Sequence, residues 1–201
     1  MTVDPADVGA SAFYKLLSSA VIPRPIGWIS TRSAAGVDNL APYSFFNAVG
    51  SNPPALLFSG SRGDDGGHKD SVTNALETGE FVWNLVSREL AEAMNNTSGS
   101  FASGTSEFDA VGVGRADSER VSPPGVAASL ARMECRVIHH FDIGTGPRSA
   151  TVVVGEVVLL HAADAAVTDG RFNAAALDAV GRLGGSEYAT THDRFSLERP
   201  A

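Results

Sequence analysis

Short apolar runs rich in β-branched and aromatic residues recur along the chain, separated by breaks that contain glycine, proline or asparagine. This pattern is typical of strands joined by turns. The break GTGPRS lies between the two longest runs and suits a hairpin connection. The segments expected to be extended are residues 26–30, 39–46, 55–59, 81–86, 130–141 and 150–161.

Helical patterns are fewer and shorter than the extended ones. The first gathers its apolar side chains on one face. The second follows Asp70 or Ser71, either of which can cap a helix, and Gly79 ends it. Residues 1–9 are expected to be loose. The expected helices are residues 10–20, 70–78, 88–94 and 173–180.

These elements indicate the fold class. The chain has 201 residues, which is enough for one domain with a sizeable core. Most of the expected strands are joined by short loops rather than by helical crossovers. An antiparallel barrel or sandwich therefore fits better than a parallel α/β sheet. We predict a mainly β protein with short helices, and the pattern leaves a β-barrel and a sandwich open.

Composition excludes several classes of protein. The chain has 15 basic and 23 acidic residues, for a net charge of −8, and no cluster of lysine or arginine. This balance argues against a nucleic-acid partner, which needs a basic face. The single cysteine, Cys135, excludes an internal disulfide and a multi-cysteine metal site. No apolar run approaches the length of a membrane span, and the acidic N-terminus lacks a signal-peptide pattern, so we expect a cytoplasmic protein.

The stretch from Ile22 to Phe46 differs from the other extended segments because polar groups crowd around one predicted hairpin. Pro23 and Pro25 precede the first run, which indicates an edge strand or the start of a strand. A turn with Gly36 at a positive φ would follow. A hairpin built only for packing would more often alternate apolar and polar residues. The polar residues are Ser30, Thr31, Arg32, Asn39, Tyr43, Ser44 and Asn47.

The strings RPIGWIST, NLAPYSFFN, NPPALLF and HKDSVTNALETGEFVWNLV, in this order, resemble the flavin reductase-like family of FMN-binding split-barrel proteins, which includes the flavoredoxins. The strings MNNTS, SEFDAVGV, MECRV and GRLGGSEY continue the similarity. The resemblance implies one FMN-binding split β-barrel domain over residues 10–190, with short terminal extensions. It also implies a homodimer with the flavin near the subunit interface.

The same resemblance implies a flavoprotein oxidoreductase. Reducing equivalents would pass from NADH or NADPH through FMN to a flavin or another acceptor. The alternative is an FMN-carrying electron-transfer protein that a protein partner reduces. A third reading is a split barrel that has lost its flavin, which the acidic pair Asp64 and Asp65 keeps open. No dinucleotide motif is present, so the nicotinamide would dock transiently over the flavin.

The resemblance assigns one group of residues to the flavin ring and its ribityl chain. Hydroxyl and amide groups can donate to and accept from flavin nitrogen and oxygen atoms. Taken by themselves, Trp28 and Tyr43 fit core aromatics better and the serines fit turn residues better, and it is the resemblance that favours the flavin. The assigned residues are Trp28, Ser30, Thr31, Pro42, Tyr43, Ser44 and Asn47.

A second group is assigned to the phosphate. The glycine-rich segment GSRGDDGG precedes a predicted helix start, and both features favour an anion. The other reading is an exposed loop with a solvated Lys69, and Asp64 and Asp65 lower the positive potential there. Arg62 is a further candidate. The assigned residues are Ser59, Ser61, Lys69 and Ser71.

Two late features complete the candidate site. His139 and His140 would face opposite sides of a strand, and by the resemblance one of them, taken as His140, approaches the flavin. A surface histidine pair is equally compatible. The string GRLGG-x-x-Y, ending at Tyr188, either closes one end of the pocket or forms a helix C-cap. No residue is assigned an acid–base role, and Cys135 is expected to be an inert buried thiol.

Overall fold

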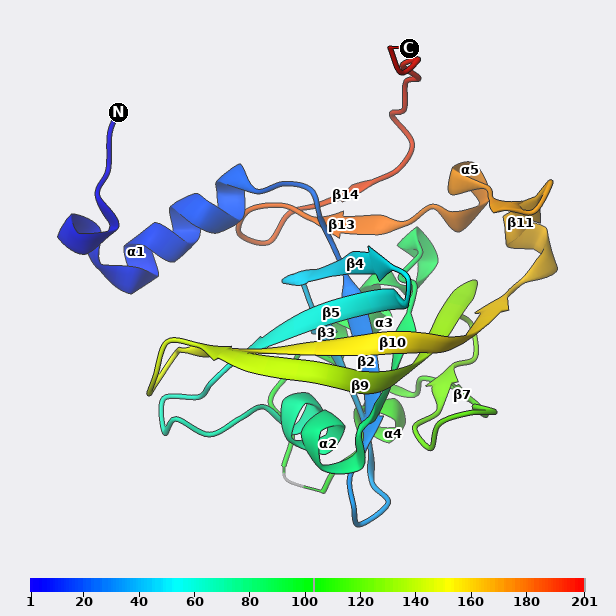
Figure 1. Ribbon diagram of the computed structural model, residues 1–201, viewed down its shortest axis with the longest axis horizontal. Helices are drawn as coiled ribbons and strands as arrows, with labels where there is room; N and C mark the ends of the chain where they lie inside the picture. Colours follow the sequence, from blue (N-terminus) through cyan, green and yellow to red (C-terminus); the bar gives the residue numbers. More distant parts are fainter. Residues whose placement is uncertain (103, 201) are drawn as a thin grey trace.

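The computed structural model describes residues 1–102 and 104–200, and its centre is a seven-stranded antiparallel sheet (Figure 1). The strand order is β3-β2-β6-β9-β10-β5-β4, and every neighbouring pair is antiparallel. The predicted mainly β architecture is confirmed. The strands are β2 Gly27–Arg32, β3 Asp38–Tyr43, β4 Phe46–Ser51, β5 Pro54–Ser61, β6 Glu80–Asn84, β9 Ala131–Ile143 and β10 Ala150–Ala162.

The sheet is buried on both faces around β2. Ile29 belongs to one apolar cluster with Phe58 and Phe81, and the helix α2 (Asp70–Thr78) covers that cluster. Trp28, one position earlier, points to the opposite face and belongs to a second cluster. Since successive side chains of a strand alternate between faces, β2 contributes to both clusters. Strand β2 is therefore held in place by apolar packing on both faces of the sheet.

The second cluster is covered by short helices after β6. These are η1 (Arg88–Leu90), α3 (Ala91–Asn96) and α4 (Glu107–Val111). Met94 and Phe108 from these helices are each 1% exposed within this cluster. The polar segment between α3 and α4 is thereby held at one end of β3. It supplies part of the candidate site described below.

The predicted helix at residues 70–78 is confirmed, but its N-terminus differs in detail. Lys69 occupies the N-cap position, and no side chain caps the helix. Neither Asp70 nor Ser71 acts as the cap, because both already have helical backbone. At the other end Gly79 adopts φ 74°, a left-handed conformation that suits glycine.

A small second sheet lies at one end of the molecule with the N-terminal helix. It has the order β1-β13-β14, from Arg24–Pro25, Val180–Arg182 and Tyr188–Thr190. Figure 1 shows the helix α1 (Pro5–Ala20) and the β13–β14 hairpin on the same side of the main sheet. The GRLGG string is therefore the turn of a hairpin and not a helix C-cap.

Several boundaries differ from the sequence predictions. Helix α1 is kinked at Gly9, which has φ 73° and ψ 160°. The part after the kink is the predicted helix over residues 10–20, and the part before it, which was expected to be loose, is capped by Asp4, whose side chain accepts from the Ala6 backbone N–H. The predicted helix over 173–180 shortens to α5 (Ala174–Leu177), since Asp178 has φ 40° and Val180 pairs within β13. Strand β2 is central and not an edge strand, because its prolines precede the ladder.

Two further features are as predicted, the β9–β10 hairpin and the burial of Cys135. Burial raises the pKa of the Cys135 thiol well above its usual range. None of the helices in the described part of the chain is long and apolar enough to span a bilayer. The minor elements are β7 Arg115–Ala116, β8 Gly125–Val126, η2 Asp164–Ala166, β11 Val167–Thr168 and β12 Arg171–Phe172.

Candidate functional site

Two pockets adjoin at Pro42 and Ser98, near the end of strand β3. We call them the polar pocket, of about 650 Å³, and the cationic pocket, of about 630 Å³. The polar pocket is lined by Asn39, Ala41, Pro42, Tyr43, Gly63, Asp64, Asp65, Gly67, His68, Lys69, Asp70, Ser71, Thr97, Ser98, Gly99, Ser100, Phe101, Ala102, Thr105 and Glu107. The cationic pocket is lined by Tyr14, Lys15, Ser18, Arg24, Ile26, Pro42, Ser44, Met94, Ser98, Arg182, Gly185 and Tyr188.

The wall of the polar pocket contains a compact group of hydrogen-bonding side chains. The side-chain amide of Asn39 hydrogen-bonds with Ser71 Oγ over 2.7 Å, which joins strand β3 to the start of helix α2. Burial raises the pKa of Tyr43 to about 12, although its hydrogen bond with Ser71 acts in the opposite direction. The phenol therefore stays protonated at neutral pH and can donate a hydrogen bond to a ligand.

Glu107 is a buried carboxylate in the same pocket. Its Oε2 accepts from the backbone N–H of Leu40 over 2.8 Å, and its side chain comes from the first turn of α4. With its amide group rotated, Asn39 also lies 3.2 Å from Oε1 of Glu107. Burial raises the pKa of Glu107, the hydrogen bond from Leu40 opposes this, and the charge of Asp70 adds to it. Perturbed carboxylates in a cleft are candidates for functional residues.

The sequence did not identify Glu107 as a residue of the candidate site. The string SEFDAVGV gives it the appearance of an ordinary acidic residue in the first turn of a helix. Such residues are usually solvated and interact with the helix N-terminus. Its burial depends on β3, more than sixty positions earlier in the chain, so no local signal marks it.

The rim of the polar pocket carries charges of both signs. Lys69 is exposed at the N-cap of α2, and Asp70 follows it. Two of the nearby carboxylates already have partners, since Asp64 pairs with Arg148 at 3.1 Å and Asp65 accepts from the backbone N–H of Gly67. The open N-terminus of α2 and Lys69 together favour an anion at this rim.

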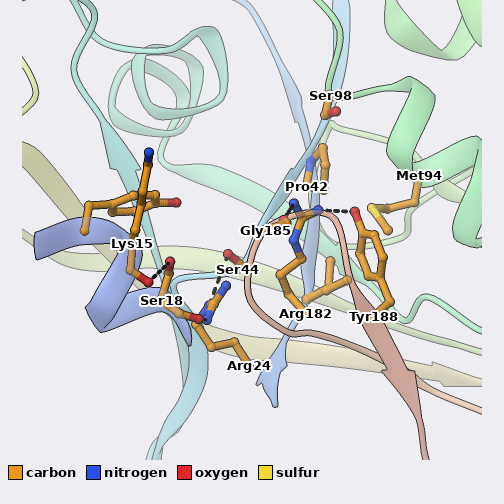
Figure 2. Close-up of a pocket in the computed structure, with 12 residues that line it drawn as sticks. Lys15, Ser18, Arg24, Pro42, Ser44, Met94, Ser98, Arg182, Gly185 and Tyr188 are labelled. Atoms are coloured by element: carbon orange, nitrogen blue, oxygen red, sulfur yellow. Dashed lines mark hydrogen bonds between the residues drawn. The ribbon is translucent and has the colours of Figure 1, made fainter. Parts of the chain in front are cut away.

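The cationic pocket lies between α1, the small sheet and the end of β3 (Figure 2). Arg24 on β1 is only 6% exposed. Its Nη1 donates to the backbone oxygens of Ser18 and Val21, and its Nη2 donates to Leu183 over 3.0 Å. These bonds tie the end of α1 to the β13–β14 hairpin.

Arg182 and Tyr188 form another part of the wall of the cationic pocket. The guanidinium lies 4.5 Å from the centre of the Tyr188 ring and donates to the Tyr188 hydroxyl and to the Gly185 backbone oxygen. The Tyr188 hydroxyl in turn lies 3.2 Å from Oδ1 of Asn95 on α3. The GRLGG-x-x-Y segment therefore does close one end of a pocket, as one of its two readings predicts.

The structure brings together part of the predicted site. Pro42, Tyr43, Lys69 and Ser71 line the polar pocket, and Ser44 lines the cationic pocket with Pro42. These five residues come from β3, the bend after it and the start of α2. The hairpin and the glycine-rich segment, which the resemblance assigned to different parts of the flavin, thus meet at one place.

Three predicted residues on β2 lie beneath the pockets and not in them. Trp28, Ser30 and Thr31 are each fully buried. Trp28 Nε1 donates to Thr97 Oγ1 over 2.9 Å, and Thr31 accepts from Asn74 on α2. The Ser30 hydroxyl has no hydrogen-bond partner among the described residues.

Four other predicted residues line neither pocket in this chain. Asn47 is exposed on β4, and His140 is exposed on β9. Ser59 and Ser61 lie in the second half of β5. The further candidate Arg62 donates to Asp142 and to the Gly66 backbone oxygen.

Comparisons with known proteins agree with this architecture. The model of a family described as "Flavin reductase like domain" matches residues 18–176. The chain is similar to the crystal structure of nitrilotriacetate monooxygenase component B from Bacillus cereus, with 33% identity, a TM-score of 0.94 and 98% of each chain covered.

Two further structures extend the comparison. One is the 2-nitrobenzoate 2-nitroreductase NbaA of Pseudomonas fluorescens, with 28% identity and a TM-score of 0.87 over 100% of this chain and 96% of that one. The other is a protein with a split barrel domain from Shewanella frigidimarina, with 22% identity and a TM-score of 0.84 over 100% of both chains. The last likeness identifies the fold as a split barrel.

Proposed function

The chain belongs to the flavin reductase-like domain family, and from this premise we propose that it is an FMN-binding oxidoreductase. Reducing equivalents would pass from NADH or NADPH through FMN to a flavin or another acceptor. The observation that carries this proposal is the polar pocket, where hydroxyl and amide groups of β3 meet the open N-terminus of α2. Similarity to a monooxygenase component and to a nitroreductase supports a redox role.

The side chains of the polar pocket fit the chemistry of FMN. Lys69 and the start of α2 would hold the phosphate, because a cation and free backbone N–H groups both favour an anion. Ser71 and the protonated phenol of Tyr43 would donate to or accept from the ribityl chain and the ring. Bound FMN supplies the two-electron redox chemistry, which no side chain of the protein provides.

Pro42 and Ser44 would position the ring. Pro42 lines both pockets, so a ring held against it is open to a second molecule in the cationic pocket. Trp28 lies beneath the polar pocket. Its indole N–H would affect the ligand through Thr97, because it holds the Thr97 hydroxyl at the wall of that pocket. Ser30 and Thr31 would likewise act by fixing β2 and not by touching the ligand.

We also propose a homodimer. Ile138, Phe141 and Ile143 on β9 are 49%, 44% and 57% exposed. Phe141 and Ile143 lie on the same face of the strand as His139, whereas His140 points to the opposite face. Such exposed apolar residues on a strand are typical of a surface that a partner covers. A second copy packed along this part of β9 would bring one of the two histidines, taken as His140, towards the flavin of the other chain. The dimer would likewise allow flavin contacts with the other residues that line neither pocket of a single chain, which are Asn47, Ser59 and Ser61.

The alternative function is FMN-carrying electron transfer without NAD(P)H turnover. An anaerobic titration of the FMN-loaded protein separates the two functions. Bleaching of the flavin absorption by NADH or NADPH within the mixing time supports the oxidoreductase. Bleaching by dithionite or a reduced protein alone supports the carrier. A protein that neither contains nor binds FMN, judged by its visible spectrum and by quenching of added FMN, would refute both.

A further inference from the structure

The cationic pocket has an unusual charge for this chain. Lys15, Arg24 and Arg182 line it, and none of the twelve described lining residues is acidic. The whole chain has a net charge of −8. Three cations without a carboxylate at one pocket are therefore not a consequence of overall composition. They create a local positive potential that a ligand of negative charge would experience.

The cations remain uncompensated within the protein. Across residues 1–102 and 104–200, no ion pair joins Lys15, Arg24 or Arg182 to a carboxylate. The acceptors around Arg24 are backbone oxygens and the Ser44 hydroxyl, and those around Arg182 are a backbone oxygen and a phenol. Neutral acceptors satisfy the N–H groups but leave the charge in place. A buried charge in this condition is stabilised when an anion arrives.

Apart from three serines and one glycine, the rest of the wall is apolar and aromatic. Ile26, Met94 and Pro42 supply aliphatic surface, and the ring of Tyr188 lies under the Arg182 guanidinium at 4.5 Å. The volume of about 630 Å³ suits a small organic molecule. A flat body would pack on these residues while its charged group faced the cations.

We propose that the cationic pocket binds a planar organic anion, an aromatic or heteroaromatic carboxylate, as the co-substrate of the flavin reaction. This inference rests on the proposed function, because Pro42 and Ser98 join the pocket to the one assigned to FMN. The carboxylate lies between Lys15 and Arg182, and the ring packs on the apolar wall. Arg24 holds α1 and the β13–β14 hairpin in place and adds positive potential from behind.

The test uses benzoate and benzamide, which share a ring and differ in charge. Each is titrated calorimetrically into the FMN-loaded protein at low and at high salt. Benzoate should bind roughly tenfold more tightly than benzamide, and added salt should weaken benzoate alone. Equal affinities for the two probes, or no binding of benzoate, would overturn the proposal.

Lys15 provides the matched variants, since its exposed side chain makes no large contribution to folding. Lys15→Gln should weaken benzoate binding about threefold to tenfold and leave benzamide and FMN binding unchanged, whereas Lys15→Arg should restore benzoate binding. Lys69→Gln, at saturating FMN, should leave benzoate binding unchanged. If Lys15→Gln weakened FMN binding instead, the cations would belong to the flavin phosphate and the proposal would fail. Benzoate binding by a protein that does not bind FMN would refute the proposed function and with it the co-substrate role, and would leave the anion site itself in place.

Discussion

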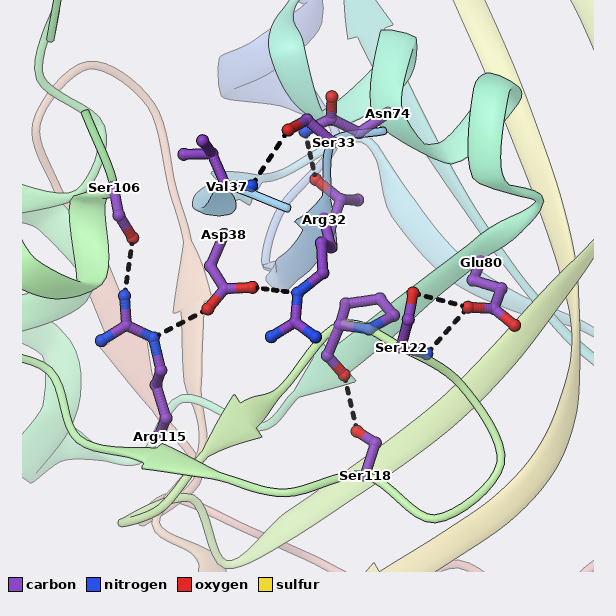
Figure 3. A network of polar contacts seen from close by, with 12 residues as sticks. Arg32, Ser33, Val37, Asp38, Asn74, Glu80, Ser106, Arg115, Ser118 and Ser122 are labelled. Atoms are coloured by element: carbon purple, nitrogen blue, oxygen red, sulfur yellow. Dashed lines mark hydrogen bonds and ion pairs between the residues drawn. The ribbon is translucent and has the colours of Figure 1, made fainter. Parts of the chain in front are cut away.

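Two groups of arginines in this protein have opposite surroundings. In the first, which we call the paired cluster (Arg32, Asp38, Asp109 and Arg115), each cation faces a carboxylate. Figure 3 shows Arg32 and Arg115 on either side of Asp38. Asp38 forms ion pairs with Arg32 over 2.7 Å and with Arg115 over 2.9 Å. Asp109 forms an ion pair with Arg115 over 2.7 Å. In the cationic pocket Arg24 and Arg182 face neutral oxygens (Figure 2).

The difference teaches how to separate structural cations from binding ones. The paired cluster ties β3 to β7 and α4, and Arg115 also donates to Ser106 at the start of α4. Its charges cancel, so little potential remains for a ligand. The cationic pocket has a comparable number of cations and leaves their charge exposed to whatever enters. The count of arginines is thus less informative than the partners of each one.

The largest expected effect comes from Arg24. Arg24→Ala leaves the Ser18, Val21 and Leu183 carbonyls without their donor at a buried site. We expect the free energy of unfolding to fall by about 2–4 kcal/mol, measured by urea denaturation. Arg32→Ala is the matched control, because removal of that arginine, which is about one third exposed, should cost less than about 1 kcal/mol. Equal losses in the two variants would contradict the anchoring role of Arg24.

Lys69 is expected to have the next largest effect, on FMN binding and not on stability. Lys69→Ala removes a charge-assisted bond to the phosphate and should weaken FMN binding by about 1.5–3 kcal/mol. The measurement is the dissociation constant from quenching of flavin fluorescence. Lys15→Ala serves as the control, since it removes a lysine from the neighbouring pocket. An unchanged constant for Lys69→Ala would remove the phosphate role from this residue.

Local patterns were sufficient to predict the long strands and helix α2 from the sequence. The β9 and β10 runs are long, and Gly79 marks the end of α2. The pockets depend on contacts between distant segments. Arg24 meets Leu183 across 159 positions, and Thr31 meets Asn74 across 43. The partners that Trp28 and Thr31 find in Thr97 and Asn74 could therefore not be predicted from local patterns, and the three-cation pocket was not foreseen.

A smaller effect is expected from breaking the paired cluster. Asp38→Asn removes the shared counter-charge of Arg32 and Arg115, and should lower the free energy of unfolding by about 1–2 kcal/mol. Both arginines are about one third exposed, so solvent screening limits the loss. FMN and benzoate binding should not change. A variant that gains benzoate affinity would show that unpaired arginines here, too, can recruit an anion.

Glu107 gives the smallest expected effect and extends the comparison to carboxylates. Arg115 lowers the pKa of Asp109 mainly through its hydrogen bond, so Asp109 favours folding above its unfolded-state pKa, and this contribution is lost as the pH falls. Burial raises the pKa of Glu107 in the folded protein. Protonated Glu107 therefore favours folding below its unfolded-state pKa near 4.5, and this contribution is lost as the pH rises through the raised folded-state pKa.

Glu107→Gln keeps an acceptor for the Leu40 N–H but removes this titration. Relative to the wild type, its free energy of unfolding should therefore increase as the pH rises from about 4.5 towards neutrality. The same substitution removes a negative charge from the polar pocket and should strengthen FMN binding slightly. Thermal unfolding across this pH range measures the first effect. Asp109→Asn should show the opposite trend only at lower pH, below the unfolded-state pKa of Asp109 near 3.8, and should show no trend between about 4.5 and neutrality. A glutamine variant that loses stability progressively with rising pH would mean that Glu107 is held as a stabilised carboxylate, and the contrast with Asp109 would disappear.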